Sequence, residues 1–425
     1  MPTVKTLAGA DFSPDLPDRL LQIAGEIRNA GGRAFLVGGW VRDALLGKSC
    51  RDYDVEVYDL TQDELVPILK RYGKTNLVGK AFGVIHVAMK GLSLDFSFPR
   101  TESKVGYGHR GFVVHTDEKL SFKEAALRRD FTINAMGMEL PELALCDPYG
   151  GIEDLKASVL RHVGPAFVED SLRILRGVQF ASRFALTLAP ETVELCRTLS
   201  LSDLSIERLF EEFKKWLLKP GKPSLGLRAF LDIKLNEFFP EVAPFMGSWE
   251  SLGVVLDSVS AKLPLLSDDQ KMILGFATLL CGEPDNVENR CLRFLERITN
   301  ESKILKGAPE LLRCLWSLNF ETVPTDSEMR RLGVCSQKFL GGLNLLCILV
   351  DAVSAEHAKN KNFAGEFREA AVRLSLMDKA PEPFLTGKML LAMGATPGKQ
   401  MGEIIKQSFE LQLDGEIRNE DEALV

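Results

Sequence analysis

Residues Phe35–Val57 read FLVGGWVRDALLGKSCRDYDVEV, and this stretch decides the fold of the N-terminal part of the chain. An apolar, strand-like run ends in Gly38 and Gly39, and a short helical pattern follows. A second strand-like run then carries Asp52 and Asp54. Because side chains two apart on a strand point to the same face, both carboxylates are expected to project together near the glycine turn. The stretch therefore predicts a strand, turn, helix and strand that present paired carboxylates.

Paired carboxylates beside a glycine turn suit one kind of chemistry above others. Two such groups hold divalent metal, which clamps the attacking and leaving oxygens of a phosphoryl transfer. Glycines leave backbone N–H groups free to bind phosphates, and the following helix offers its positive N-terminus. For an Asp-x-Asp pattern alone, the alternative is a polar face on a solvated strand. The preceding strand, Gly-Gly turn and helix at this spacing favour a metal site at Asp52 and Asp54.

The motif GGWVRDALLG followed by DYD resembles the signature of the polymerase β-like nucleotidyltransferases. More narrowly, it is similar to the bacterial class II tRNA nucleotidyltransferase (CCA-adding) and poly(A) polymerase family. The resemblance continues, in the expected order, through RRDFTINAM at 128–136, DPYGGIEDL at 147–155 and EDSLRILR at 169–176. It implies an α+β fold, with a nucleotidyltransferase head of mixed β-sheet and helices before an all-α remainder. The implied parts are a head at 1–150, a neck at 151–240, a body at 241–375 and a tail at 376–425.

The resemblance also implies roles for individual residues. Those expected to secure the nucleotide are Gly38, Gly39, Arg42 and Arg129. Asp130 is placed to read the ribose hydroxyls, because a carboxylate accepts their hydrogen bonds. Asp170 and Arg173 would read the base edge, with Arg176 as neighbouring support. The motif at 147–155 corresponds to a hinge between head and neck, and we assign it a structural role.

The pair Asp170 and Arg173 offers a physical basis for choosing the base. A carboxylate accepts one hydrogen bond and a guanidinium donates one beside it. CTP and ATP each present an amino donor next to a ring-nitrogen acceptor, whereas GTP and UTP present the opposite order. One Asp–Arg pair would thus admit C and A without a template. The alternative is an ordinary ion pair along one helix face. Many family members carry a further arginine where this chain has Gln179, so the contact made by that arginine is not assigned here.

Two further strands are predicted at Val84–Met89 and Leu92–Phe98, with Asp95 in the second. Asp95 is either a third catalytic carboxylate, serving as a base for the attacking hydroxyl, or a strand-end residue that meets a backbone amide. Residues Arg100–Gly111 are basic and glycine-rich without periodicity, which predicts a surface loop. In the family, a loop at this place is associated with switching from C addition to A addition. Its presence favours full CCA addition.

Composition bounds the class of protein. The chain has 425 residues, 45% hydrophobic and 26% charged, which is ordinary for a globular protein. No apolar run approaches a membrane span, and no signal peptide is recognised. Eight cysteines without a C-x-x-C pair indicate a reduced, cytoplasmic setting. The net charge of −7 argues against non-specific RNA binding and predicts a local RNA-binding patch instead.

The second half reads as helices with short loops. Residues 241–330 keep the outline of a His-Asp metal phosphohydrolase domain, but its metal positions correspond to Ser251 and to Cys281 and Gly282. Because the chain contains no His-Asp dipeptide, we read this part as a decayed domain and expect no second hydrolytic activity. The segment 385–402 is punctuated by glycines. It predicts either a contact to tRNA phosphates or a plain helix-loop-helix.

Together these patterns predict template-independent addition of CCA to the 3′ end of tRNA from CTP and ATP, with release of pyrophosphate. The expected cofactor is Mg²⁺, held by Asp52 and Asp54, and the expected partner is tRNA, bound by its 3′ end and its acceptor and T arms. Enzymes that add only A or only CC, and bacterial poly(A) polymerases, share these motifs and stay as alternatives. A catalytically silent RNA-binding relative is a further alternative.

Overall fold

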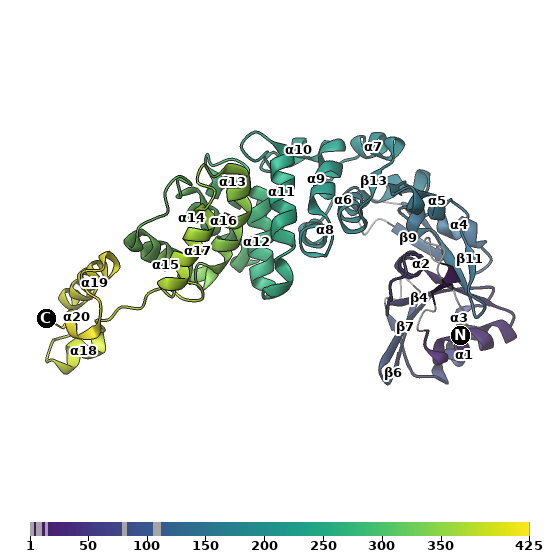
Figure 1. Ribbon diagram of the computed structural model, residues 1–425. Helices are drawn as coiled ribbons and strands as arrows, with labels where there is room; N and C mark the ends of the chain where they lie inside the picture. Colours follow the sequence, from purple (N-terminus) through teal and green to yellow (C-terminus); the bar gives the residue numbers. More distant parts are fainter. Residues whose placement is uncertain (1–3, 6–10, 13–15, 79–82, 105–111, 425) are drawn as a thin grey trace. The chain divides into compact units, whose positions relative to one another are not determined.

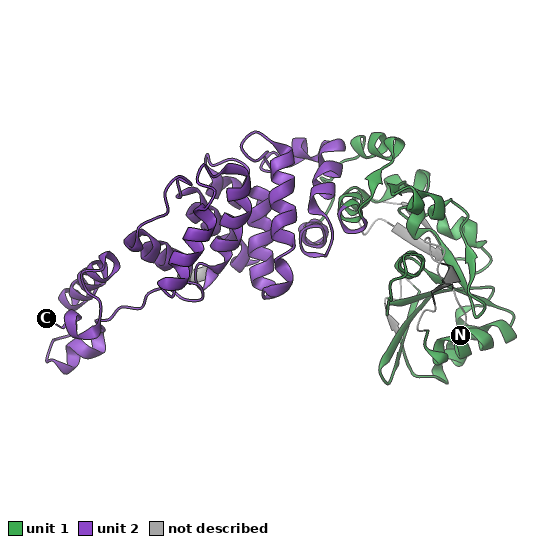
Figure 2. Ribbon diagram, viewed as in Figure 1, with its two compact units in different colours: residues 1–181, 185–205 green, residues 182–184, 206–425 purple. Residues whose placement is uncertain are grey.

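The computed structural model describes residues 4–5, 11–12, 16–78, 83–104 and 112–424. The chain forms two compact units, which Figure 2 colours separately. Unit 1 contains residues 1–181 and 185–205, and unit 2 contains residues 182–184 and 206–425. Unit 1 combines a mixed sheet with helices, whereas unit 2 is helical (Figure 1). This confirms the predicted α+β class. The four-part division at 150, 240 and 375 stays a prediction.

The centre of unit 1 is a seven-stranded sheet with the order β11-β10-β3-β4-β7-β6-β5. The adjacent strands β4 and β7 run parallel, and the other neighbours in this sheet run antiparallel. The strands are β3 Arg33–Val37, β4 Tyr53–Tyr58, β5 Lys74–Val78, β6 Val84–Met89, β7 Leu92–Ser97, β10 Gly137–Leu140 and β11 Ala144–Cys146. The two strands predicted from the sequence before and after residue 90 are thus confirmed to within one residue.

Helices and small strand pairs complete unit 1. Helices α1 and α3 contact each other, and each also contacts the sheet (Figure 1). The helical elements are α1 Asp18–Asn29, α2 Gly39–Leu45, α3 Gln62–Lys70, α4 Phe122–Ala126, the 3-10 turn η2 Thr132–Asn134, α5 Gly151–Lys156, the 3-10 turn η3 Pro165–Glu169, α6 Leu172–Phe184 and α7 Pro190–Arg197. The strand pairs are β1 Val4–Lys5 with β2 Asp11–Phe12, β8 Arg100–Lys104 with β9 Phe112–Thr116, and β12 Val159–Leu160 with β13 Thr187–Leu188.

Local sequence explains the turn from β3 into α2. Strand β3 buries its last four residues, so its apolar run anchors the turn to the core. Gly38 has φ 69° and ψ −136°, a conformation that residues with a Cβ atom rarely adopt. On the core side, the rings of Phe35 and Phe122 stack at 4.9 Å, and Phe35 meets Tyr58 edge-on at 5.3 Å. The strand that leads into the glycine turn is therefore anchored by a packed aromatic cluster.

Several local expectations from the sequence need correction. The basic stretch from Arg100 is not loop throughout, because residues 100–104 pair with β9 over five positions. The rest of that predicted loop, 105–111, lies outside the described residues, as does the 13–15 segment before α1. The apolar residues after Arg129, which by their composition alone look like a buried strand, form the 3-10 turn η2, since the N–H groups of Asn134 and Ala135 bond back three residues. The region after 151 also contains one short pair of parallel strands.

Unit 2 is a series of amphipathic helices. Helix α8 buries residues at spacings of one, three and four along its length, and among them the Phe213 ring lies 5.2 Å from both Phe239 and Phe294. The helices are α8 Ile206–Leu218, α9 Pro223–Asp232, α10 Leu235–Phe238, α11 Trp249–Ser260, the 3-10 turn η4 Leu263–Leu265, α12 Asp268–Leu280, α13 Val287–Glu296, α14 Ser302–Trp316, α15 Asp326–Leu340, α16 Asn344–His357, α17 Phe363–Arg373, α18 Gly387–Ala392, α19 Lys399–Asp414 and α20 Glu420–Ala423. Among the described residues, none of the helices has the length and apolar character needed to cross a membrane.

In unit 2, the backbone is packed at the positions that the sequence compares with the metal ligands of a phosphohydrolase domain. Ser251 lies in the first turn of α11, where its N–H donates to the Ser248 hydroxyl. Cys281 is buried at the end of α12, and its carbonyl accepts a hydrogen bond from the Trp316 indole at 3.2 Å. A Cβ atom on Gly282 would lie only 2.1 Å from the Ala243 carbonyl oxygen. These positions therefore serve the packing of the helices.

Candidate active site

The sheet brings Asp54 and Asp95 side by side. They are register partners on the parallel strands β4 and β7. On the other side of Asp95, His86 of β6 is its antiparallel partner, and the His86 Nδ1 lies 2.7 Å from the Asp95 Oδ1. Sequence reasoning missed His86, although the signal was present. A two-residue hairpin turn between Met89 and Leu92 sets a register that pairs residues 86 and 95.

A cavity of about 750 Å³ collects the three predicted catalytic carboxylates. Asp52 immediately precedes β4 and is exposed, and Asp54 and Asp95 follow on the sheet. The cavity wall also contains Trp40 from α2 and Lys48 from the loop after that helix. The carboxylates thus line one open volume large enough for a nucleotide. The sequence placed Asp52 and Asp54 on one strand, but the strand begins at Tyr53 and only Asp54 lies on it.

The electrostatics of this cavity favour a cation. The pKa of Asp54 is raised, first because surrounding protein removes part of its hydration and next because of the Asp95 charge. Asp52 raises it further, while the guanidinium of Arg129 acts in the opposite direction. Carboxylate oxygens are the ligands of Mg²⁺, which typically takes one or two of them together with substrate phosphates and water. The described residues contain no group of three or more His, Cys, Asp and Glu that could hold an ion alone. The donor set fits a metal whose remaining ligands come from a nucleotide.

Arg42 supports the glycine turn from inside. Its side chain is only 3% exposed, its Nη1 donates to the Asn134 Oδ1 at 2.5 Å and its Nη2 lies 2.9 Å from the Asp43 carboxylate. A Cβ atom on Gly39 would lie 3.1 Å from the Arg42 Nη2. The guanidinium therefore lies close under the first residue of α2, where it braces the turn that is predicted to bind phosphate.

Arg129 reaches the same turn from another segment. Its Nη1 would lie 3.9 Å from a Cβ atom on Gly38, and it donates to the Asn134 carbonyl at 3.4 Å. Its Nη2 donates to the carboxylate of Glu56 at 3.2 Å. The structure thus brings Gly38, Gly39, Arg42 and Arg129 together, as predicted. It adds Asn134 and Glu56, which sequence reasoning did not nominate.

Asp130 is buried and fully occupied by protein donors. Its Oδ1 accepts from the Phe131 N–H at 2.7 Å and the Asn134 amide at 3.1 Å. Its Oδ2 meets Arg176 twice, through Nε at 2.7 Å and through Nη2 at 2.5 Å. Burial alone would raise the pKa of Asp130, but the Arg176 charge and these hydrogen bonds lower it. A carboxylate accepts roughly four hydrogen bonds. Contact with a ribose therefore requires Asp130 to exchange one of these partners.

Asp170 and Arg173 lie at the start of α6. The Asp170 Oδ1 accepts from the Leu172 N–H at 3.1 Å. The Arg173 guanidinium donates to the carbonyl oxygens of Ala166 and Arg128, each at 2.5 Å. In this arrangement Arg173 ties the segment before α6 to the Arg128–Asp130 motif. The Arg173 N–H donates to the Asp170 backbone carbonyl at 3.0 Å, and part of the Arg173 guanidinium is engaged by backbone.

Two predicted features lie outside this site. Gln179 is 2% exposed, so its side chain is buried in α6. In the tail, Lys388 and Lys399 lie in the first turns of α18 and α19 of unit 2.

Comparison with known proteins gives the same assignment. The family described as "Poly A polymerase head domain" matches residues 34–161, and "Probable RNA and SrmB-binding site of polymerase A" matches residues 185–246. A relative called "Multifunctional CCA protein" from Xanthomonas campestris is 40% identical over 223 residues, which cover 51% of this chain and 52% of the relative. The chain thus aligns with about half the length of the curated relatives it matches.

Solved structures match over nearly the whole chain. A Thermotoga maritima CCA-adding enzyme complexed with tRNA has a TM-score of 0.66 at 22% identity, covering 100% of this chain and 98% of that one. A Bacillus stearothermophilus CCA-adding enzyme in complex with CTP has a TM-score of 0.64 at 24% identity, covering 95% and 94%. The shared fold therefore extends through both units, while the sequence similarity is concentrated in the head and neck. Nucleotidyltransferases of this kind generally use divalent metal ions. Residues 34–161 are thus similar to the poly(A) polymerase head domain, and residues 185–246 are similar to the RNA-binding region of polymerase A.

Proposed function

We propose that this protein adds CCA to the 3′ end of tRNA without a template, using CTP and ATP and releasing pyrophosphate. The observation that carries the proposal is the cavity that Asp52, Asp54 and Asp95 line together with Trp40 of α2, the helix that follows Gly38. The matches to the poly(A) polymerase head and RNA-binding models, and solved CCA-adding neighbours that are complexes with tRNA, CTP and ATP, support the same substrates here. Because tRNA and these nucleotides meet in the cytoplasm, we place the protein there.

Asp52 and Asp54 would hold Mg²⁺ in this proposal. When bound, Mg²⁺ supplies positive charge that activates the 3′-hydroxyl of the tRNA and stabilises the leaving pyrophosphate. The repulsion that raises the pKa of Asp54 supports this role, since a cation would relieve it. Backbone N–H groups of Gly38 and Gly39 would bind the phosphates, and the Arg129 guanidinium beside Gly38 would donate to them.

Asp95 would accept the proton of the attacking hydroxyl. The His86 imidazole, 2.7 Å from its Oδ1, would hold this carboxylate in one orientation. Asp170 and the free part of the Arg173 guanidinium would read the base edge. Asp130 would bind the ribose and Arg176 would support it. For this contact, Asp130 must exchange one of its present hydrogen-bond partners for a ribose hydroxyl.

The test uses the purified chain with Mg²⁺ and three tRNA transcripts, ending at the discriminator base, in C, or in CC. Each receives CTP alone, ATP alone or both, and products are sized to one nucleotide. We expect the first transcript to gain three nucleotides only when both CTP and ATP are present. A matched control is Glu139→Gln, which removes a surface carboxylate of the same sheet that pairs with Arg33.

The other outcomes identify the alternatives. A stop at CC indicates a CC-adding enzyme, and extension of the CC-ended transcript alone indicates an A-adding enzyme. Long A tracts on any RNA indicate a poly(A) polymerase. No extension under any condition, in a protein that still binds tRNA, indicates a silent relative and contradicts the proposal.

A further inference from the structure

Glu56 is a buried carboxylate within the stretch Phe35–Val57, and the sequence motifs assign no role to it. It follows Asp54 by two residues on β4, and its side chain is 1% exposed. Its Oε1 lies 3.2 Å from the Arg128 Nη2, and its Oε2 lies 3.2 Å from the Arg129 Nη2. The Tyr58 hydroxyl donates to the same Oε2 at 2.6 Å. One carboxylate, on the strand that carries Asp54, thus pairs with two neighbouring arginines.

The charge state of this cluster is well defined. Burial alone would raise the pKa of Glu56, but the charges of Arg129 and Arg128, with the Tyr58 hydrogen bond, lower it below its usual range. Burial, followed by the Glu56 charge, raises the pKa of Tyr58, so its hydroxyl stays protonated and remains a donor. Glu56 is therefore an anion with fixed partners at neutral pH.

The geometry of Arg129 shows what this anion controls. Glu56 holds the Nη2 end of the guanidinium, while the Nη1 end lies beside the Gly38 turn. The Nε–H is buried and has no hydrogen-bond partner among the described residues. Arg129 also acts electrostatically on Asp54. Because a planar guanidinium held at one end can turn little, the contact with Glu56 sets the direction of the donors that face the turn.

We propose that Glu56 is a positioning residue for nucleotide binding: it orients Arg129 so that the guanidinium meets the triphosphate at the glycine turn. This inference rests on the proposed function for the identity of the ligand. It predicts that Glu56 contributes to the affinity for phosphates and does not contribute to the choice of base. Arg128 also pairs with Glu56, but its backbone carbonyl accepts a hydrogen bond from Arg173. We therefore group Arg128 with the residues that are proposed to read the base.

The experiment measures binding of ATP, CTP and AMP to the full chain with Mg²⁺ and without tRNA. We expect Glu56→Gln to weaken ATP and CTP by the same factor, about tenfold, because one oriented charge-assisted contact is lost. AMP, which lacks the β- and γ-phosphates, should change less than about twofold. Glu139→Gln on the same sheet is the control and should bind all three like the wild type.

A double-mutant cycle separates this role from a general effect on folding. If Glu56 acts through Arg129, Glu56→Gln should cause little further loss of ATP affinity in an Arg129→Ala background. In an Arg128→Ala background, the loss of about tenfold should remain. Tyr58→Phe keeps the charge and removes one hydrogen bond, so we expect a loss of about threefold. This variant decides the matter if Glu56→Gln does not fold.

Three results would overturn the inference. They are unchanged ATP affinity in folded Glu56→Gln, an equal loss for ATP and AMP, and a full further loss in the Arg129→Ala background. If Glu56→Gln is unfolded, unchanged ATP affinity in Tyr58→Phe would overturn the inference instead. A wild-type protein that binds ATP and CTP but extends no tRNA would instead contradict the proposed function, and the comparison of Glu56 variants would still stand.

Discussion

At the scale of single residues, strand β4 carries two acidic side chains with different partners. Along β4, Asp54 faces the cavity and Glu56 is buried, so one strand face supplies a cation site and then an anchor for arginines. In the unliganded protein, the ionised form of Asp54 is destabilised by burial and by the charges of Asp95 and Asp52. Such a cost in stability is typical of residues kept for chemistry.

Asp54→Asn should therefore increase stability while it abolishes activity. Because the native protein holds the Asp54 proton more tightly than the unfolded chain, stability falls as pH rises from about 4 through the raised pKa. Asparagine removes that loss, and it also removes a metal ligand, which should lower kcat by about a thousandfold. The measurements are thermal unfolding without divalent ions at pH 4 to 7 and the tRNA extension assay. Asp63→Asn on α3 is a control, and a lower Tm for Asp54→Asn would contradict the prediction.

Asp130 behaves in the opposite way. Its ion pair with Arg176 lowers its pKa against the effect of burial, so its contribution is present above pH 4 and is lost as pH falls through the lowered pKa. Asp130→Asn should lower the free energy of unfolding by about 3 kcal/mol at neutral pH, and by less in acid. Urea unfolding at pH 7 and pH 3.5 measures this difference. The control is Glu142→Gln, which removes an exposed ion pair with Arg28.

The same Asp130 variant tests the ribose contact. If Asp130 also reads the ribose in the bound state, the preference for ATP over dATP should fall by about tenfold, as for a lost hydrogen bond to a charged group. An unchanged preference would leave Asp130 with its structural role alone.

At the scale of elements, short helices hold the motifs in place through their first turns. Helix α5 begins at Gly151, and the Asp147 carboxylate accepts from the N–H groups of Gly151 at 2.8 Å and Ile152 at 2.9 Å. Inside the same helix, Asp154 accepts from the Thr132 hydroxyl at 2.7 Å and from Arg161 at 3.1 Å. The hinge motif thus locks α5 to the turn that follows Arg129, which agrees with the structural role predicted for it.

Asp147→Ala should release the first turn of α5. Two backbone N–H groups lose their acceptor, and a lost helix cap typically costs about 1 kcal/mol. Denaturant unfolding measures the loss, and hydrogen exchange should be faster in α5 than in the central sheet. Asp147→Asn, which keeps an acceptor, should lose less than Asp147→Ala. Equal stability of Asp147→Ala and the wild type would show that water replaces the cap at no cost.

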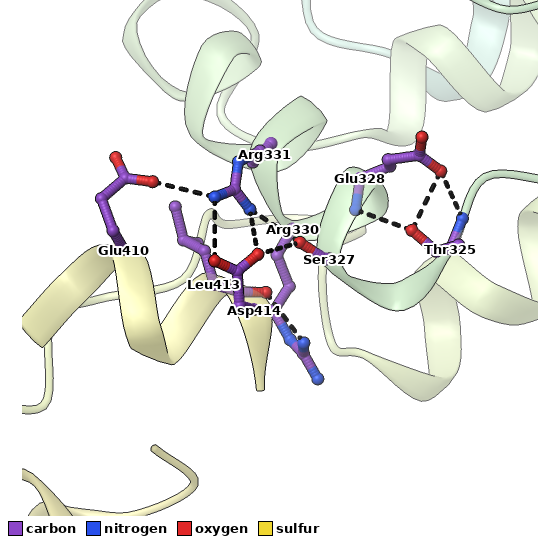
Figure 3. Close-up of polar contacts among 8 residues, drawn as sticks. All are labelled: Thr325, Ser327, Glu328, Arg330, Arg331, Glu410, Leu413 and Asp414. Atoms are coloured by element: carbon purple, nitrogen blue, oxygen red, sulfur yellow. Dashed lines mark hydrogen bonds and ion pairs between the residues drawn. The ribbon is translucent and has the colours of Figure 1, made fainter. Parts of the chain in front are cut away.

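At the scale of the whole molecule, the chain joins unit 1, which carries the proposed active site, to the helical unit 2, whose last part is the predicted tail. Figure 3 shows how α19 of the tail is attached to α15. The Arg331 guanidinium contacts both Asp414 and Glu410 at 2.9 Å, and Ser327 donates to Asp414 at 2.7 Å. Arg330 donates to the Leu413 carbonyl at 3.1 Å, at the C-terminal end of α19. The attachment shown in Figure 3 is thus polar and exposed, which makes it sensitive to salt.

Arg331→Ala should loosen the tail without affecting the head. Exposed ion pairs are worth about 1 kcal/mol or less each, so we expect a loss of roughly threefold in the affinity for full-length tRNA. The KM for a short acceptor-stem hairpin should stay the same if the contact predicted for residues 385–402 is to the phosphates of the T arm. Lys359→Ala, which removes the exposed ion pair with Glu321, is the control. Equal effects on both RNAs would contradict a role for the tail in tRNA binding.

The sequence alone determined the order of the head elements and the presence of a carboxylate site. The β3 run, the Gly38 turn and the alternation through Asp52 and Asp54 are local patterns, and each is fixed by residues within one or two turns or strands of itself. The resemblance then placed Arg129, Asp130 and Arg173 in one site, and the structure brings their segments together.

Only the tertiary structure decided the partners of these groups. Glu56 meets Arg129 across 73 residues of sequence, and Asp130 meets Arg176 across 46. A pattern along one strand or helix indicates which face a side chain occupies, but not which distant segment packs against that face. The pairing of His86 with Asp95 and the burial of Glu56 between two arginines follow from strand order and packing, which the fold as a whole sets.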